Sequence, residues 1–318
     1  MAINKIFSKL SFLLSFLLTL SACGGGGGGG SDNASRVSAT PSSSKFTSWD
    51  KITEGTTSFE GISYAGSYRA NLSSDRVTQV NSVAYSENAG ADLTYQSCGN
   101  NLLCLTRASL QTPNDTVTWN TNAGDTIERS SIISGLTIAY SSNLEELALA
   151  SEPLILEHNY NEFGVWLTGV NTGSGRFGAL SLGSKTNPAN VPINNSANFF
   201  GLVMGMAIDQ FGNYALAGAD LRVAASFSNR TLDFYSSNTL LSEDTINFIY
   251  YPGYNLRGRL TYSNNSSNFS GNLFVSGSDL IGPAKGRFYG PSANEIGGVF
   301  DLRGSGLTRY IGSFGASR

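Results

Sequence analysis

Histidine, cysteine and proline are scarce in this sequence of 318 residues, which has one His, three Cys and eight Pro. The single histidine, His158, leaves serine- or cysteine-based acyl transfer with one candidate base, and no nucleophile-elbow pattern accompanies it. Lysine and arginine total 20 against 23 acidic residues, without a basic block. Because nucleic-acid binding requires clustered cations that replace phosphate counterions, the sequence predicts neither an enzyme nor a nucleic-acid binder.

Long apolar runs are also missing, since no stretch reaches the roughly 18 residues that a transmembrane helix requires. Residues 1–22 instead carry two lysines before a short apolar run over 10–20, which is typical of a signal peptide. The Leu-Ser-Ala-Cys sequence that ends at Cys23 resembles a bacterial lipoprotein signal, in which the cysteine thiol takes a lipid such as palmitate. We therefore expect membrane attachment through an N-terminal lipid on Cys23. The alternative is a secreted protein in which Cys23 is incidental.

A glycine- and serine-rich segment follows the signal. Seven consecutive glycines after Cys23 and a run of small polar residues predict a flexible anchor linker over residues 23–45. The remaining chain is long enough for two modest domains. We place an N-terminal domain at 46–192 and a C-terminal domain at 193–318, with 184–196 as the connection.

The two other cysteines, Cys98 and Cys104, are closely spaced in "SCGNNLLCL". In an exported chain such a pair predicts a disulfide that closes a hairpin-like loop, worth about 2 kcal/mol for so short a loop. A metal site is the alternative. Two thiols without a neighbouring His or further Cys fall short of the four ligands that zinc prefers, so we expect no metal.

The pattern from residue 46 onward is that of β-structure, with many short alternating runs rich in Gly, Ser, Asn and Thr. One segment, 141–153, reads as a helix, with polar residues before its first turn and Pro153 beyond its end. "GSGRFG" at 173–178 fits a dinucleotide-binding pattern, but an alternating strand rather than a helix follows it. We interpret it as a hairpin turn.

Alternation is clearest in the C-terminal domain, where runs such as "ADLRVAASF" place apolar residues on one face only. Eight antiparallel strands with dry inner faces can close into a barrel. The run at 198–208 is apolar on both faces, so we expect the N-terminal domain to cover its outer face. The eight runs are 198–208, 218–228, 230–236, 256–263, 268–277, 284–290, 296–303 and 309–317.

Two segments near the end, "GRFYGPSANEIGGVFDL" and "YIGSFGASR", resemble the closing strands of the barrel domain in the transferrin-binding protein B family of surface lipoproteins. Upstream, "FFGLVMG", "LAGADLRVAASF" and "RTLDF" resemble the first three barrel strands of that family, and "FGVWLTG" resembles the end of its smaller handle domain. The resemblance implies an all-β fold, with a β-rich handle followed by an eight-stranded antiparallel barrel. Within this motif, we expect Gly-Pro at 290–291 to end a strand, Gly297 and Gly298 to permit a sharp bend or a close strand approach, and Glu295 to cap backbone donors.

The resemblance further implies a lipoprotein at the cell surface of the outer membrane. Its expected role is to capture an iron source, either a host iron protein or haem, and to deliver it to an outer-membrane receptor. The chain has room for one handle and barrel lobe, whereas the transferrin binders have two. The alternative is a surface module without a nutritional role, such as an adhesin or a binder of complement regulators.

Two sets of residues are candidates for ligand binding. His158, in sequence next to Glu157 and near Tyr160 and Glu162, could supply one axial bond to haem; the alternative is a structural histidine. Haem is expected only as a ligand, not as a resident cofactor.

The second set lies on the segment "INFIYYPGYN" at 246–255. Aromatic clusters on loops anchor protein interfaces, because tyrosine buries a large area at little cost in rotamer freedom. The alternative is a strand extension packed on the barrel. Because the inside of an eight-stranded barrel is filled by side chains, we expect the ligand on loops or between the domains. The candidates are Phe248, Tyr250, Tyr251 and Tyr254.

Overall fold

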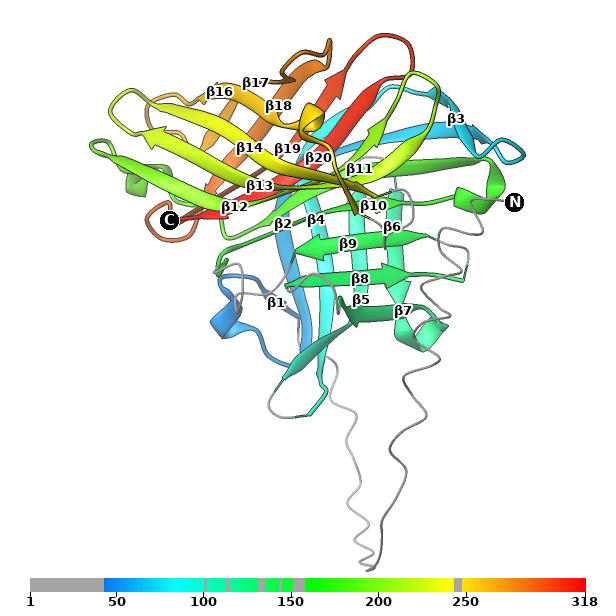
Figure 1. Ribbon diagram of the computed structural model, residues 1–318. Helices are drawn as coiled ribbons and strands as arrows, with labels where there is room; N and C mark the ends of the chain where they lie inside the picture. Colours follow the sequence, from blue (N-terminus) through cyan, green and yellow to red (C-terminus); the bar gives the residue numbers. More distant parts are fainter. Residues whose placement is uncertain are drawn as a thin grey trace, which may run out of the picture.

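The computed structural model describes residues 43–99, 102–112, 115–130, 135–142, 145–150, 158–242 and 248–318. Over these residues the chain forms two mainly antiparallel β-sheet units, connected by residues 184–195 (Figure 1). The first unit is a broad, strongly curved sheet and the second is a closed barrel. The predicted all-β fold class, a β-rich handle followed by an eight-stranded antiparallel barrel, is confirmed.

The handle sheet has the strand order β6-β5-β4-β2-β11-β10-β9-β8-β7 in the described part of the chain. The short strands β1 and β3 pair with β2, and β1 does so in parallel, so the last residues of the predicted linker lie in this sheet. The hairpin turn predicted at 173–178 lies a few residues earlier, between β10 and β11, and residues 174–178 already belong to β11, so the predicted position is wrong although the hairpin exists. The handle strands are β1 (Ser43–Lys45), β2 (Gly55–Asn71), β3 (Arg76–Val80), β4 (Ala84–Ser97), β5 (Leu103–Thr112), β6 (Asp115–Asn120), β7 (Thr126–Arg129), β8 (Leu136–Tyr140), β9 (Glu146–Ala150), β10 (Asn161–Leu167) and β11 (Ser174–Gly183).

The barrel closes because β13 pairs with both β12 and β14, so that its eight described strands form a ring, with β15 attached outside it. All eight predicted strand runs coincide with strands of this ring. The strands are β12 (Ser196–Ile208), β13 (Tyr214–Ser226), β14 (Thr231–Ser242), β15 (Phe248–Tyr250), β16 (Leu256–Thr261), β17 (Asn268–Val275), β18 (Ile281–Tyr289), β19 (Glu295–Arg303) and β20 (Arg309–Ser317).

Apolar side chains fill the inside of the barrel. Each strand sends alternate residues inward, as the period of two requires, and aromatic rings such as Phe234, Phe269, Phe288 and Phe314 pack edge to face or stacked at the centre. All four are at most 2% exposed. The barrel is therefore a packed core and not an open ligand cavity.

The helix predicted over 141–153 is wrong in the part of that segment that the structure describes. Strand β9 lies there and pairs with β8 and β10. Leu147 and Leu149 point into the handle core at 1% and 0% exposure, which is the period of a strand. The glutamates and leucines that favour a helix locally are outweighed by burial between two strands, since sheet context routinely overrides helix propensity.

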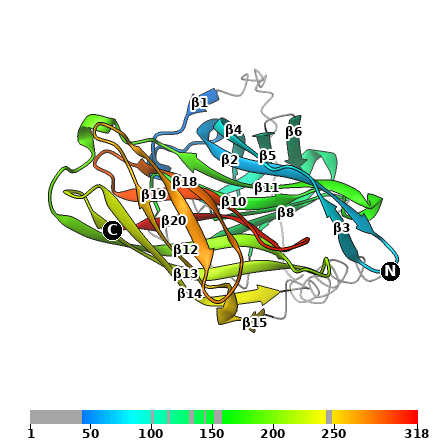
Figure 2. The same ribbon diagram turned by 90° about the horizontal axis from the view of Figure 1, so that it is seen from above.

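The handle packs on one side of the barrel, along β10 and β11 against β19 and β20 (Figures 1 and 2). Tyr68 and Phe177 of the handle share a buried cluster with Met206, Ile208 and other barrel residues. The expectation that the handle covers the outer face of 198–208 is confirmed for this half of β12. It is wrong for the other half, where Phe200 is 59% exposed, because the handle does not extend that far along the strand.

Polar contacts from the closing-strand motif fix the handle on the barrel. The Glu295 carboxylate accepts the backbone N–H groups of Asn159 and Tyr160, which belong to the handle. The Asn161 side-chain amide donates to the Ile296 carbonyl at 3.1 Å, and the Tyr289 and Ser181 hydroxyls lie 3.1 Å apart. Glu295 therefore caps backbone donors, as expected, but the donors lie about one domain away in the sequence.

Candidate functional site

The described part of the predicted aromatic segment, residues 248–255, forms a short arm at the side of the barrel. Strand β15 pairs with β14, with Tyr250 opposite Leu240 and Ile249 opposite Leu241. The turn that follows is the 3-10 segment Pro252–Tyr254, which Pro252 begins at a position where its missing N–H costs nothing. The Tyr251 N–H donates to the Thr239 carbonyl at 2.8 Å, which holds the turn against β14.

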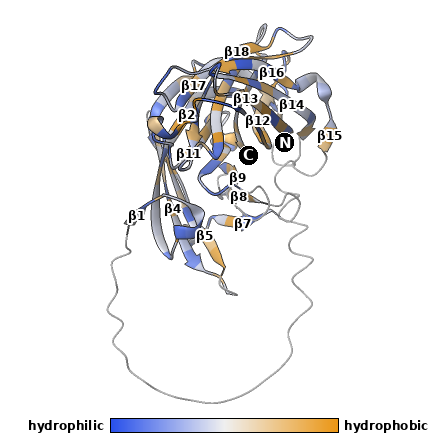
Figure 3. Cartoon of the chain, turned by 90° about the vertical axis from the view of Figure 1, so that its left-hand side faces the viewer, coloured by the Kyte–Doolittle hydropathy of each residue, from blue (hydrophilic) through white to orange (hydrophobic). Residues whose placement is uncertain are grey.

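Large apolar side chains of this arm face solvent. Ile249 is 63% exposed, Tyr250 58% and Tyr251 50%, and the neighbouring Leu240 is 38% exposed. Figure 3 shows β15 as a hydrophobic segment at the rim of the barrel. We refer to Leu240, Ile249, Tyr250 and Tyr251 as the tyrosine patch. Leu240 and Tyr250 are cross-strand partners on one face of the arm, whereas Ile249, next to Tyr250 in the strand, points to the other face. Several large exposed apolar groups on one short arm mark interaction sites more often than isolated ones do.

Two of the four predicted partner-binding residues are less exposed to solvent than the other two. Tyr254 is half-buried and packs against Tyr310 with ring centroids 5.7 Å apart, and burial raises the pKa of its hydroxyl. Phe248 is also half-buried. Tyr254 therefore closes one end of the barrel core, whereas Tyr250 and Tyr251 are free to contact a partner. Leu240 was missed because its exposure depends on its register opposite Tyr250, which the sequence alone does not reveal.

His158 lies in a buried position beside the barrel. It is 2% exposed, its ring lies 5.6 Å from that of Phe163, and within the described structure neither ring nitrogen has a hydrogen-bond partner. Burial lowers the pKa of the imidazole to about 4, so it is neutral at pH 7. A bond from His158 to an iron would require this packing to open. Glu157, its predicted neighbour, lies outside the described residues.

The other acidic and aromatic residues near His158 point elsewhere. Glu162 is fully buried, and the Tyr95 hydroxyl approaches its carboxylate at 3.5 Å inside the handle. Burial raises the pKa of Glu162 well above its usual value. Tyr160 lies instead against Gly290 of the barrel. The structure therefore does not gather His158, Tyr160 and Glu162 into one cluster.

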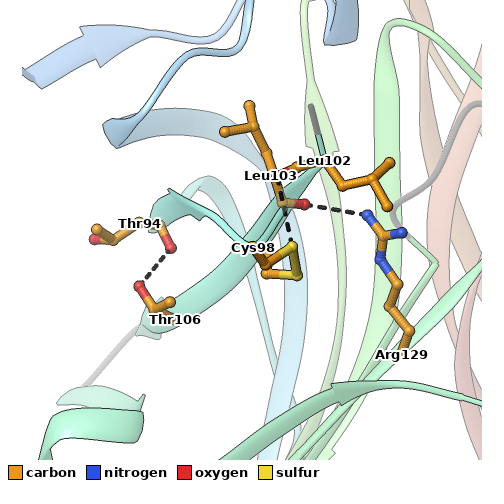
Figure 4. Close-up of a disulfide and its surroundings, with 7 residues drawn as sticks. Thr94, Cys98, Leu102, Leu103, Thr106 and Arg129 are labelled. Atoms are coloured by element: carbon orange, nitrogen blue, oxygen red, sulfur yellow. Dashed lines mark hydrogen bonds between the residues drawn. A yellow bond between two sulfur atoms is a disulfide. The ribbon is translucent and has the colours of Figure 1, made fainter. Parts of the chain in front are cut away.

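The disulfide between Cys98 and Cys104 closes the turn from β4 to β5 (Figure 4). The Cys98 N–H donates to the Leu102 carbonyl at 3.0 Å, and Arg129 of β7 donates to the Leu103 carbonyl at 3.1 Å. The bond therefore fixes the tip of a hairpin that also contacts the far edge of the handle sheet. Cys23 lies outside the described residues.

Two cavities of the described structure are small, and the larger of them, about 50 Å³, lies in the handle beside Trp49, Tyr95 and Ile127. An apolar cavity of about 20 Å³ lies between handle and barrel, lined by Tyr68, Phe177, Met206, Tyr214 and others, which is space for about one water molecule. Among the residues with described positions, no three His, Cys, Asp or Glu side chains gather into a possible metal site. Nor does this part of the chain contain a helix of the length and hydrophobicity needed to cross a membrane.

The comparisons with solved structures give similar proteins of low sequence identity. Transferrin binding protein B from Haemophilus parasuis is 12% identical, with 88% of this chain and 78% of that chain covered and a TM-score of 0.44. Transferrin binding protein B from Neisseria meningitidis is 12% identical, with coverages of 74% and 53% and a TM-score of 0.44. The N-lobe of lactoferrin binding protein B from Moraxella bovis is 10% identical, with coverages of 81% and 99% and a TM-score of 0.37.

A comparison with curated protein sequences finds no match. The family described as "C-lobe and N-lobe beta barrels of Tf-binding protein B" matches residues 191–318. This range contains the whole closed ring from β12 to β20. The resemblance of the chain to the transferrin-binding protein B family, predicted from its closing-strand motif, is thereby confirmed over the barrel domain.

Proposed function

We propose that this protein is a lipid-anchored binding protein of the outer-membrane surface that captures a protein ligand, with a host iron protein of the transferrin type as first candidate. The observation that carries the proposal is the tyrosine patch, where Ile249, Tyr250 and Tyr251 are each at least half exposed on the arm attached to β14. Tyrosine is enriched among the residues that dominate protein interfaces. The family match of the barrel supports the choice of ligand class.

A macromolecular ligand suits this geometry better than a small molecule. The inside of the barrel is packed, and the cavity between handle and barrel holds about one water. The exposed apolar groups lie on β14 and on the β15 arm, where solvent reaches them. Small-molecule sites are concave and bury most of the ligand, whereas protein interfaces are broad and use exposed aromatic anchors.

Attachment to the membrane belongs to the same proposal. A lipid on Cys23 and the glycine- and serine-rich linker predicted between Cys23 and β1 would hold the handle and barrel near the membrane while leaving the tyrosine patch accessible. A captured iron source would then pass to an outer-membrane receptor. If Cys23→Ser protein still sediments with outer membranes after a carbonate wash, this part of the proposal is wrong.

Binding is tested with immobilised mature protein and soluble ligands: iron-loaded transferrin, iron-free transferrin, lactoferrin and a complement regulator. We expect one of the iron proteins to bind, and Tyr250→Ala and Tyr251→Ala each to cost about 1 to 2 kcal/mol of binding free energy. Ile193→Ala is the matched control, because Ile193 is 73% exposed away from the patch. Binding of the complement regulator alone would favour the alternative of an adhesin or host-protein binder.

Haem is the second candidate ligand, and the unpartnered ring nitrogens of His158 are the observation in its favour. Titration of the protein with haemin would then give a Soret band that His158→Ala weakens or shifts. Tyr250→Ala should leave that band unchanged. A protein ligand predicts the opposite pattern, with binding sensitive to Tyr250 and insensitive to His158.

A further inference from the structure

A second exposed surface crosses the barrel wall at right angles to the strands. Its members come from six neighbouring strands of the ring and all point outward. Four of them are large apolar side chains, with exposed fractions of 59% for Phe200, 44% for Tyr235, 40% for Phe274 and 53% for Ile281. We refer to the whole set as the barrel-wall row: Phe200, Arg222, Tyr235, Arg257, Phe274 and Ile281.

The strand register places these residues side by side. In each pair of neighbouring strands the two row members are direct cross-strand partners, so the side chains form one continuous line. Along the line, arginine alternates with an aromatic ring until the last two members. The partner pairs are Phe200 with Arg222, Arg222 with Tyr235, Tyr235 with Arg257, Arg257 with Phe274, and Phe274 with Ile281.

The two arginines of the row are not neutralised within the described structure. Arg222 donates to the Asn198 side-chain oxygen at 3.2 Å, and the guanidinium of Arg257 lies 5.6 Å from the centre of the Tyr235 ring. Neither forms an ion pair with a described carboxylate. By contrast, Arg259 of the same strand β16 binds Asp233 through two nitrogens, at 2.6 and 3.1 Å.

The spacing of the arginines defines the partner geometry. Arg222 and Arg257 have one strand between them, so at about 4.8 Å per strand their backbones stand about 10 Å apart. Carboxylates at positions i and i+7 of an α-helix lie about 10.5 Å apart on one face. Apolar side chains at i+3 or i+4 of such a helix would lie over Tyr235.

We propose that the barrel-wall row docks an acidic helical segment of a second protein, with two carboxylates on Arg222 and Arg257 and apolar side chains on the rings between them. Guanidinium groups favour such sites because their planar donors match a carboxylate and stack on aromatic faces. The row lies on β12 to β18, whereas the tyrosine patch lies on the β14–β15 arm. The inference therefore goes beyond the proposed function and does not depend on it.

A protein partner fits this surface better than an anionic membrane. The row contains arginine and aromatic residues but no lysine, which is the composition of protein interfaces. The carboxylates of Asp220 and Asp233 stand on the same outer face next to the row. A continuous sheet of lipid phosphates would meet these carboxylates, whereas two discrete acidic side chains can avoid them.

The probe for this surface is a fluorescein-labelled helical peptide with Glu at i and i+7, Leu at i+3 and i+4, and alanine elsewhere. Its binding to the full mature protein is followed by fluorescence polarisation at low salt. We expect binding that weakens with added salt, and a loss of roughly tenfold in affinity in the double variant Arg222→Gln with Arg257→Gln. The control is Arg69→Gln with Arg107→Gln, which changes net charge equally at two exposed handle positions.

Each outcome decides for or against the proposal. Equal losses in both double variants, binding of a peptide with Lys in place of Glu, or no peptide binding at all would overturn it. Stronger binding of vesicles with anionic lipid than of the peptide, lost in the Arg222 and Arg257 variant, would assign the row to a membrane instead. Thermal melts of both variants verify folding, which exposed substitutions should leave intact.

Discussion

Both carboxylate oxygens of Glu295, in the barrel, lie 3.0 Å from the backbone nitrogen of Tyr160, in the handle. Glu295 is 2% exposed, so this contact is a buried charge-assisted bond between the two sheets. Burial nevertheless raises the pKa of Glu295 to about 7, against the lowering effect of the N–H donors. The closing-strand motif thus joins handle to barrel besides closing the barrel.

Replacement of Glu295 by glutamine should destabilise the protein by about 2 kcal/mol, because an amide nitrogen would replace one acceptor oxygen and face N–H donors. Urea unfolding at pH 8, where the carboxylate is largely ionised, measures the difference in free energy of unfolding. Glu87→Gln is the control, since Glu87 is exposed. Equal midpoints for the two variants would show that the bonds to Asn159 and Tyr160 contribute nothing.

Two glycines of the motif allow the handle to approach. A Cβ atom on Gly297 would lie 2.6 Å from the Ser181 hydroxyl, and one on Gly315 would lie 2.3 Å from the Phe163 ring. We expect Gly297→Ala and Gly315→Ala each to cost about 1 to 3 kcal/mol in urea unfolding, because the handle must shift away. Gly218→Ala is the matched control, because Gly218 is on an outward strand position where an added Cβ atom would meet no other group within 4 Å. Losses as small as that of Gly218→Ala would contradict the role of close approach.

The sequence was sufficient to predict the barrel strands because each carries its own alternation. Leu221 and Val223, for example, are inward and buried, and the exposed Arg222 between them faces out. It failed at β9, where Leu147 and Leu149 are explained by two neighbouring strands rather than by local propensity. Structure that depends on the pattern within one segment could therefore be predicted from the sequence. Structure that depends on the neighbouring strands could not.

The candidate binding surfaces also depend on strand pairing that the sequence alone does not reveal. The aromatic content of 246–255 was visible, but only the pairing of β15 with β14 separates the exposed Tyr250 from the half-buried Tyr254. Likewise the barrel-wall row depends on the register between six strands. Each of its members lies on a different strand, so the row cannot be seen in any one stretch of the sequence. The sequence also suggested that Glu295 caps backbone donors, but not that Asn159 and Tyr160 provide them.

Loss of the disulfide should weaken the handle without affecting the barrel. A double variant, Cys98→Ser with Cys104→Ser, releases a short loop between β4 and β5, and the chain-entropy model values such a bond at about 2 kcal/mol. Differential scanning calorimetry should give a lower melting temperature for the double variant than for wild type. Wild-type protein in the presence of a reductant should melt at the same lowered temperature. An unchanged melting temperature would mean that the Leu102 and Leu103 backbone contacts hold the hairpin without the bond.

His158 should make the protein sensitive to acid. Its pKa falls from 6.5 to about 4 on burial, so between these values the unfolded chain binds a proton that the folded protein does not. The contribution of the neutral, buried imidazole to the free energy of unfolding is fully present above pH 6.5. It is lost as the pH falls towards 4, by roughly 2 to 4 kcal/mol in total. Glu295, with its raised pKa, acts in the opposite sense. The part of its contribution that depends on pH is present below pH 4.5 and is lost as the pH rises through about 7, while the hydrogen bonds from Asn159 and Tyr160 to the carboxylate persist.

The two effects are separated by comparing variants at each pH. In urea unfolding from pH 4 to 8, the free energy of unfolding of wild type minus that of His158→Phe should fall as the pH is lowered through 6.5 to 4. Phenylalanine is chosen because the site is apolar and already borders Phe163. The same comparison with Glu295→Gln should slope the other way. Parallel curves for wild type and His158→Phe would mean that the imidazole is protonated in the folded protein, and hence that water or an acidic partner reaches a ring that is 2% exposed.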